Sequence, residues 1–443
     1  MRKRKAILFL LTIIAILAYS QLNRSSVDST GLPAAKEIHG DMLVSIPPVD
    51  DAIQTFQNRV KQNPKDAVSY TLLGELYIRQ ARETGDVAGY QRAELALNEA
   101  LELLPGYSPA GSTLSSVYYA QHEFKEALDL AGRVYESNPK NISALVIMGD
   151  AFLSLGNYQK AEEIYQQLGA TEATSPVLAR LAHLAELNGK PEEALQLMRR
   201  AAGNALQSEG TRESVAWYLL RVADVYFNMG KIDEAGDYYE AALRVFDNYH
   251  LALAGLGKVR AAEGKYDEAI AYYKHAVNII PQADFLAALG DLYMITGQSE
   301  EAQLQYETVE FIGTLAAVNQ QIYNRQLANF YSDHDLKLDE ALDLALDELE
   351  SRKDIYGYDA AAWAYYKNGN YKDAQRMMDQ AMALGTRDAL LFYHAGVIAQ
   401  AIGENQKARN LLQQALTINP HFSILHSCEA RQAMNALQAQ AGE

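Results

Sequence analysis

Large, small and aromatic residues recur in a fixed order along most of the chain. In the segment 253–281, large apolar residues precede Gly257, and Gly264, Ala269 and Pro281 then follow in turn. The alanine of this pattern recurs ten times, as Ala93, Ala127, Ala161, Ala194, Ala235, Ala269, Ala302, Ala341, Ala374 and Ala408. Neighbouring members are 33 to 41 residues apart, and most are 33 or 34 apart. Such a period predicts repeated helix pairs that bury their apolar faces only by stacking on one another.

Each residue type in the pattern has a physical reason to be there. Glycine and alanine allow the two helices of a pair to approach closely, and the tyrosines fill the larger gaps between pairs. Glycine after a helix relieves its left-handed cap, and proline ends a repeat because it cannot continue a helix. The order resembles the tetratricopeptide repeat over residues 67–420. The resemblance implies an all-α superhelical solenoid of about ten helix-turn-helix repeats.

Shorter segments flank the predicted array. Residues 49–66 have apolar positions typical of one helix, which predicts an N-terminal half-repeat that caps the array. Residues 421–443 combine Ile424, Leu425, Met434 and Leu437 with polar residues, which predicts a C-terminal capping helix and tail. Residues 21–48 contain serines, a glycine and prolines without sustained periodicity, and we expect a flexible linker there.

Residues 1–20 have the composition of an export signal. The cations Arg2–Lys5 precede an apolar run, Ala6–Tyr19, that spans about 21 Å as a helix and is short for a bilayer core of roughly 30 Å. We expect either a signal peptide cleaved after Ser20 or a retained signal anchor. In both cases the rest of the chain lies outside the cytoplasm, in the periplasm or secreted. Contact with a membrane is then expected only through the N-terminal segment, if it is uncleaved.

Charge and cysteine content exclude several classes of function. The chain has 39 basic and 56 acidic residues, a net charge of −17. Such a surface repels phosphate backbones, so nucleic acid is excluded as a main partner. Cys428 is the only cysteine, which excludes an intrachain disulfide and a multi-cysteine zinc site. An export signal without a disulfide framework favours a bacterial envelope over a eukaryotic secretory route.

The chain contains no motif of an enzyme or a cofactor site. Glycine-rich nucleotide-binding patterns, nucleophile elbows and metalloprotease motifs are all absent from the sequence. Asp333–Asp335 could supply metal ligands, but an Asp-His-Asp run is more typical of a polar turn. His421, His426 and Cys428 do not share one helical face. We therefore expect no catalytic residue, no metal and no cofactor.

The resemblance implies that ligands are held by first-helix side chains on the concave face. Among these first-helix positions, aromatic residues with acidic neighbours gather at two places. These candidate binding residues are Trp217, Asp224 and Phe227 in repeat five, and Tyr356, Asp359, Trp363, Tyr366 and Tyr393 in repeats nine and ten. They suit a protein or peptide partner with basic and apolar anchors. The alternative is that the rings pack against neighbouring helices.

The sequence thus predicts a non-enzymatic scaffold for protein–protein interaction outside the cytoplasm. It would bind a partner segment in its concave groove, and the resemblance implies a role in the assembly of an envelope or secretion complex. Two alternatives stay open at this point. One is a metal-handling or enzymatic envelope protein with an unrecognised site. The other is a structural envelope protein that associates with itself.

Overall fold

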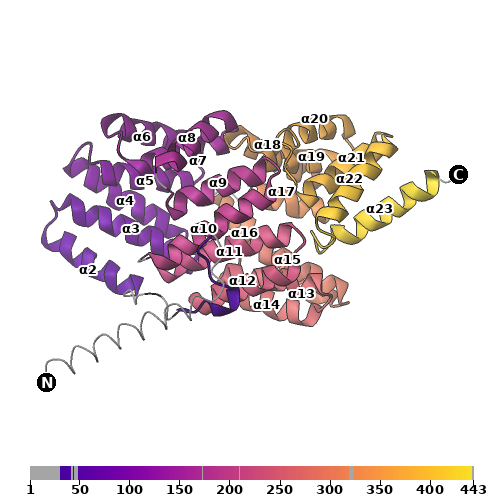
Figure 1. The fold of residues 1–443 in the computed structure, drawn as a ribbon, viewed down its shortest axis with the longest axis horizontal. Coiled ribbons are helices and arrows are strands. Elements are labelled where there is room, and N and C mark those ends of the chain that lie inside the picture. The colour runs from indigo at the N-terminus through magenta and orange to yellow at the C-terminus, as the bar shows by residue number, and fades with distance from the viewer. Residues whose placement is uncertain are drawn as a thin grey trace, which may run out of the picture.

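The protein is an array of helix pairs that winds into a superhelix (Figure 1). The structure is a computed structural model and describes residues 30–40, 43, 48–171, 173–208, 210–318 and 324–441. These residues form 22 α-helices and one short 3-10 helix, and no strand occurs among them. The expected signal segment, residues 1–20, lies outside the described residues. Within the described ranges, no helix has the length and apolar character needed to cross a membrane.

Ten helix pairs follow one another, as the repeat pattern predicts. The first helices are α3 (Ala67–Thr84), α5 (Ser108–Ala120), α7 (Ile142–Ser154), α9 (Ser175–Leu187), α11 (Arg212–Asn228), α13 (His250–Ala262), α15 (Ala283–Ile295), α17 (Asn324–Asp333), α19 (Ile355–Lys367) and α21 (Ala389–Ala401). The second helices are α4 (Ala88–Leu103), α6 (Phe124–Ser137), α8 (Tyr158–Thr171), α10 (Pro191–Gln207), α12 (Ile232–Val245), α14 (Tyr266–Ile279), α16 (Ser299–Val318), α18 (Leu338–Ser351), α20 (Tyr371–Ala381) and α22 (Asn405–Ile418). The all-α repeat fold expected from the sequence is therefore confirmed.

Small residues hold each pair together at the predicted positions. A Cβ on Gly257 of α13 would lie 2.6 Å from the Tyr273 ring of α14, so only glycine allows this approach. From the other helix, Ala127, Ala161 and Ala235 are fully buried. Overpacking such contacts costs about 1–3 kcal/mol, which explains why these positions are glycine or alanine in most repeats.

Single helices cover both ends of the array. At the N-terminal end, α2 (Val49–Gln62) packs on α3, and Gln57 Nε2 donates a hydrogen bond of 2.9 Å to the Tyr77 hydroxyl. At the C-terminal end, α23 (His426–Ala441) packs on α22. Both helices cover apolar surface that the terminal repeats would otherwise expose to water.

Successive turns of the superhelix touch each other. The Ile355 amide donates to the Tyr158 hydroxyl at 2.8 Å across a separation of 197 residues, and Thr386 Oγ1 donates to the Leu187 carbonyl across 199. Further along, Asn419 Nδ2 donates to a carbonyl 192 residues earlier. Each contact joins the turn within one repeat to the loop that precedes a later repeat or, for Asn419, the final helix. The two superhelical turns are therefore in contact along this line, and these contacts close the superhelix.

Glycines in left-handed turns make these contacts close. Gly156 and Gly230 have φ of +78° and +74°. A Cβ on Gly156 would lie 2.6 Å from the Lys353 carbonyl oxygen, and one on Gly230 would lie 2.8 Å from the Ile418 carbonyl oxygen. The turn needs glycine for its φ, and the neighbouring superhelical turn needs glycine for space.

Part of the expected flexible linker packs on the array. Within 21–48, the 3-10 helix η1 (Ala35–Glu37) lies against α12, and Leu32 and Ile38 are fully buried in its core. Arg244 of α12 donates to the Ala35 carbonyl at 2.7 Å and to the Ile38 carbonyl at 3.1 Å. The linker expectation is corrected for residues 30–40, because their few apolar side chains are spaced to enter one groove of the array.

Candidate functional site

The inner face of the second superhelical turn contains a large cavity. This inner cavity has a volume of about 770 Å³ and is lined by α13, α15, α17 and residues 421–431. Its α15 side is built from the small residues Ala283, Ala287 and Ala288. Short side chains at successive turns of this helix leave room above its backbone on that side of the cavity.

Asp284 is the acidic residue of the inner cavity whose carboxylate is available to a ligand. Its side chain is exposed, and its carboxylate has no hydrogen bond or ion pair with any described residue. Crowding by the surrounding helices raises the pKa of Asp284, while the charges of Lys258 and Arg325 act in the opposite direction. A carboxylate in this setting gains from a cation that brings its own hydrogen-bond donors.

The other carboxylates of the inner cavity already have partners. Asp291 accepts hydrogen bonds of 2.8 Å from both the Tyr306 hydroxyl and His334 Nε2. Asp333 accepts from Trp363 Nε1 at 2.7 Å and from His426 Nε2 at 3.0 Å. These carboxylates hold the array together and are not free for a ligand.

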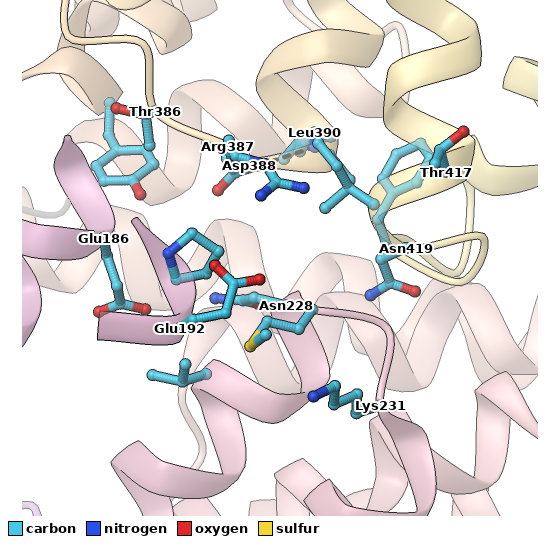
Figure 2. Close-up of a pocket in the computed structure, with 17 residues that line it drawn as sticks. Glu186, Glu192, Asn228, Lys231, Thr386, Arg387, Asp388, Leu390, Thr417 and Asn419 are labelled. Carbon is cyan, nitrogen blue, oxygen red and sulfur yellow. Dashed lines mark hydrogen bonds between the residues drawn. The ribbon is translucent and has the colours of Figure 1, made fainter. Parts of the chain in front are cut away.

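A second, inter-turn cavity of about 390 Å³ lies between the two superhelical turns. Figure 2 shows Arg387 and Asp388 on one wall, facing Glu192 and Lys231 on the other. Asp388 caps α21, because its Oδ1 accepts from the Leu390 amide at 2.8 Å. The volume is in the range of ligand pockets, but its walls carry both signs of charge and favour no single class of ligand.

The candidate aromatic cluster of repeats nine and ten lies in the core. Trp363 is 2 % exposed and stacks on Tyr366 with ring centroids 5.0 Å apart. Tyr393 and Asp359 are also buried; the Tyr393 hydroxyl donates to Glu429 at 2.6 Å, and Asp359 Oδ1 lies 2.8 Å from a nitrogen of the His394 ring. The structure thus corrects the expectation that Trp363 and Tyr393 present their rings to a partner. Both rings pack between helices, as in the alternative given above.

The second candidate cluster is also mostly engaged within the array. Phe227 is buried, and Trp217 is partly buried with its ring against the core of repeats four to six. Asp224 accepts hydrogen bonds from the Tyr239 hydroxyl at 2.7 Å and from Arg221 at 2.9 Å. Tyr356, from the other candidate cluster, is partly buried and lines the inter-turn cavity. The structure does not bring these residues together into one surface.

Sequence reasoning missed Asp284 and the C-terminal wall of the inner cavity. Asp284 is the second residue of the first helix in repeat seven, the position that the candidate Tyr356 occupies in repeat nine. The repeat pattern contains this position, but a single acid is a weak signal in a chain with 56 acidic residues. The wall formed by residues 421–431 has no local signal in the sequence, because it depends on the superhelical pitch.

Metal-ligating residues do not cluster in the described part of the chain. No group of three or more His, Cys, Asp or Glu side chains there is arranged to hold a metal ion. Two histidines instead pair with carboxylates of the array: His334 with Asp291, and His426 with Asp333 and Glu429.

Comparisons with known proteins agree with this architecture. Models described as tetratricopeptide repeat match residues 118–187, 172–248, 214–282 and 360–421. The chain is 26 % identical over 278 residues to Protein CTR9 homolog of Arabidopsis thaliana, a match that covers 60 % of this chain and 24 % of the plant protein. It is 26 % identical over 140 residues to the formate-dependent nitrite reductase complex subunit NrfG of Escherichia coli O157:H7, which covers 31 % of this chain and 66 % of that subunit.

A solved tetratricopeptide repeat protein from Parabacteroides merdae is similar at 20 % identity and a TM-score of 0.42, with 56 % of this chain and 92 % of that chain covered. The chain spans about a quarter of the length of the plant relative and two thirds or less of the bacterial subunit. The repeat models, by contrast, match residues that together make up more than half of this chain. On that ground, and with ten helix pairs in the structure, the chain belongs to the tetratricopeptide-repeat family.

Proposed function

We propose that this chain is a non-enzymatic scaffold that holds a partner protein segment in its inner cavity, outside the cytoplasm. Tetratricopeptide-repeat proteins are protein-interaction scaffolds, and the inner cavity is formed by first helices of consecutive repeats. The partner segment is basic and apolar. A Lys or Arg pairs with Asp284, and an apolar side chain lies over the alanines of α15.

The exposed carboxylate of Asp284 is the observation that carries this proposal. The neighbouring acids Asp291 and Asp333 are satisfied by described side chains, whereas Asp284 is not. A partner cation therefore gains the full interaction at Asp284 without first displacing an internal partner. Closure of the superhelix adds to the affinity, because a rigid groove loses little conformational entropy on binding.

The proposed location rests on the cations Arg2–Lys5 and the apolar run that follows them. We infer a bacterial envelope, where the scaffold acts in assembling an envelope or secretion complex. The similarity to NrfG, which is named as a subunit of a reductase complex, supports a role within an assembly. A reporter fused after Glu443 should be active only in an exported compartment, and activity in the cytoplasm would contradict the location.

Binding in the inner cavity can be tested with synthetic peptides. A library in which Lys or Arg is interspersed with Leu or Phe is titrated against the wild-type chain, and the tightest peptide is kept as the probe. Asp284→Asn removes the charge, and Ala287→Trp fills the cavity; each should weaken probe binding by about tenfold or more. Asp343→Asn is the matched control, because Asp343 is an exposed acid on the second helix of repeat eight.

The outcomes separate the possibilities. Loss of binding in both inner-cavity variants, with the control unchanged, supports the proposal. Unchanged binding in Asp284→Asn and Ala287→Trp would place the binding surface elsewhere. Equal weakening in the Asp343→Asn control would mean that the peptide responds only to the overall negative charge.

A further inference from the structure

Helix α16 has apolar residues on two opposite faces. It is 20 residues long, whereas α14 and α18 each have 14. Its inward face carries Ala302, Tyr306, Val309 and Gly313, of which Ala302 and Val309 are fully buried. A Cβ on Gly313 would lie 2.7 Å from the side chain of Leu327, so this face is in close contact with the next repeat.

The outward face carries a second row of residues, which we call the α16 stripe: Leu304, Thr308, Phe311 and Leu315. Leu304 and Phe311 are each 60 % exposed, and Leu315 is 45 % exposed. The stripe repeats the spacing of the inward row, shifted by two residues, which turns a helix by about 200°. Alternating steps of four and three residues are the spacing with which one helix packs along another.

The other repeats show that this surface is unusual within the same chain. The position equivalent to Leu304 is occupied elsewhere by Leu95, Asp129, Glu163, Gln196, Asp237, Ala271, Asp343, Arg376 and Asn410. The position equivalent to Phe311 is occupied by Glu102, Glu136, Ala170, Gly203, Arg244, Asn278, Glu350, Ala383 and Thr417. Only α16 has large apolar residues at both positions. Stacking of the repeats does not require them, since nine repeats stack without them.

Acidic residues border the α16 stripe on both sides. Glu300 and Glu307 lie along one edge and Glu301 along the other, and all are exposed. The helix contains no lysine or arginine. A second copy of α16 laid along the stripe would bring like charges together, and an anionic membrane surface would be repelled in the same way. A helix with cations beside its apolar row is attracted instead.

We propose that the α16 stripe is a docking surface for an amphipathic helix of a partner, with apolar residues spaced three and four apart and Lys or Arg beside them. This surface is separate from the inner cavity, because it lies on the outward face of a second helix. The chain would then hold two segments at once, one in the inner cavity and one on the α16 stripe.

The test uses a designed helical peptide with leucines at three- and four-residue steps and lysines at the flanking positions. Its sequence-matched partner carries glutamates in place of the lysines. Fluorescence anisotropy measures binding to the full chain. The triple variant Leu304→Gln, Phe311→Gln, Leu315→Gln should bind the lysine peptide about tenfold or more weakly, with unchanged thermal unfolding. Leu95→Gln is the matched control, because Leu95 is an exposed leucine at the equivalent position of repeat one.

Preference for the lysine peptide, lost in the triple variant and kept in Leu95→Gln and in Asp284→Asn, supports the proposal. Equal binding of both peptides, or unchanged binding in the triple variant, would overturn it. A wild-type dimer that becomes a monomer in the triple variant would identify a second copy as the occupant and overturn it too. If the wild-type chain bound vesicles of phosphatidylcholine and phosphatidylglycerol and the triple variant did not, the occupant would be a membrane, and the proposal would again be overturned.

Discussion

Contact between successive superhelical turns can be tested at a single glycine. Gly156 lies in the turn between α7 and α8 with φ of +78°, and its Cα faces the Lys353 carbonyl of the next superhelical turn. Gly264 lies in the equivalent turn between α13 and α14 with φ of +75°, and a Cβ there would meet nothing within 4 Å. Substitution of each glycine with alanine therefore imposes the same backbone strain. Only at position 156 does the new Cβ also meet the neighbouring superhelical turn.

The expected magnitudes follow from these geometries. A left-handed alanine costs roughly 1–2 kcal/mol, and the stiffer unfolded chain returns about 0.4–1 kcal/mol. Gly264→Ala should thus lower the free energy of unfolding by about 1 kcal/mol. In Gly156→Ala, the new Cβ at 2.6 Å from the Lys353 carbonyl oxygen must push the turns apart. Overpacking adds about 1–3 kcal/mol, and each inter-turn hydrogen bond that breaks adds about 0.5–1.5 kcal/mol.

We therefore expect Gly156→Ala to be less stable than Gly264→Ala by about 2–4 kcal/mol. Urea unfolding followed by circular dichroism measures the difference. Hydrogen exchange measures the local effect at the Ile355 amide, which donates to the Tyr158 hydroxyl across the same contact. Small-angle X-ray scattering should show a larger radius of gyration for Gly156→Ala alone.

The reasoning would be refuted if both variants lost the same free energy and scattered alike. The two superhelical turns would then be apart in solution, and the space next to Gly156 would be open. Faster exchange at Ile355 in both variants would have the same meaning, because Gly264 has no neighbour through which to act.

Three further substitutions test the core. Trp363→Phe removes the indole donor to Asp333 and should lower the free energy of unfolding by about 1–3 kcal/mol, measured by urea unfolding. Burial alone lowers the pKa of His426, but hydrogen bonds to Asp333 and Glu429 outweigh it and raise the pKa to about 9. The free energy of unfolding that this pairing contributes is fully present below the unfolded pKa of about 6.5 and is lost as pH rises through about 9. Melting temperatures of the wild-type chain should decline over that pH range, and His426→Gln should remove the decline. Asn419→Ala removes a buried inter-turn hydrogen bond and should cost about 1–2 kcal/mol, whereas an unchanged melting temperature would contradict that contact.

The fold could be predicted from the sequence because its signals are local and repeated. Gly257 and the glycines at the equivalent position of other repeats mark close helix contacts within one repeat, and the structure places a tyrosine ring or a leucine side chain against each. Repeat eight follows the pattern too, with Ala328 as its fully buried small residue. Because the pattern recurs ten times, a repeat of irregular length does not obscure it.

The candidate site could not be predicted as well, because it depends on the path of the superhelix. Trp363 stands at a groove position of its own repeat, yet its indole is covered by His394 of α21 and His426 of α23. The repeat pattern describes one repeat and its neighbours, and it carries no information about the segment that caps the array. The packing of residues 30–40 on α12 was missed for the same reason, because it joins segments some 206 residues apart.

The inner cavity exists only because the superhelix is closed. Its floor is formed by α13, α15 and α17, but its remaining wall is formed by residues 421–431, which directly follow the contact between Asn419 and Phe227. If that contact opened, the C-terminal segment would move away and Asp284 would lie on an open helix surface, where a salt bridge is worth about 0–1 kcal/mol. The α16 stripe depends on no such closure, because it belongs to one helix. Loosening the superhelical turns should therefore weaken binding in the inner cavity while leaving the outward surface unchanged, which assigns the two surfaces different physical origins.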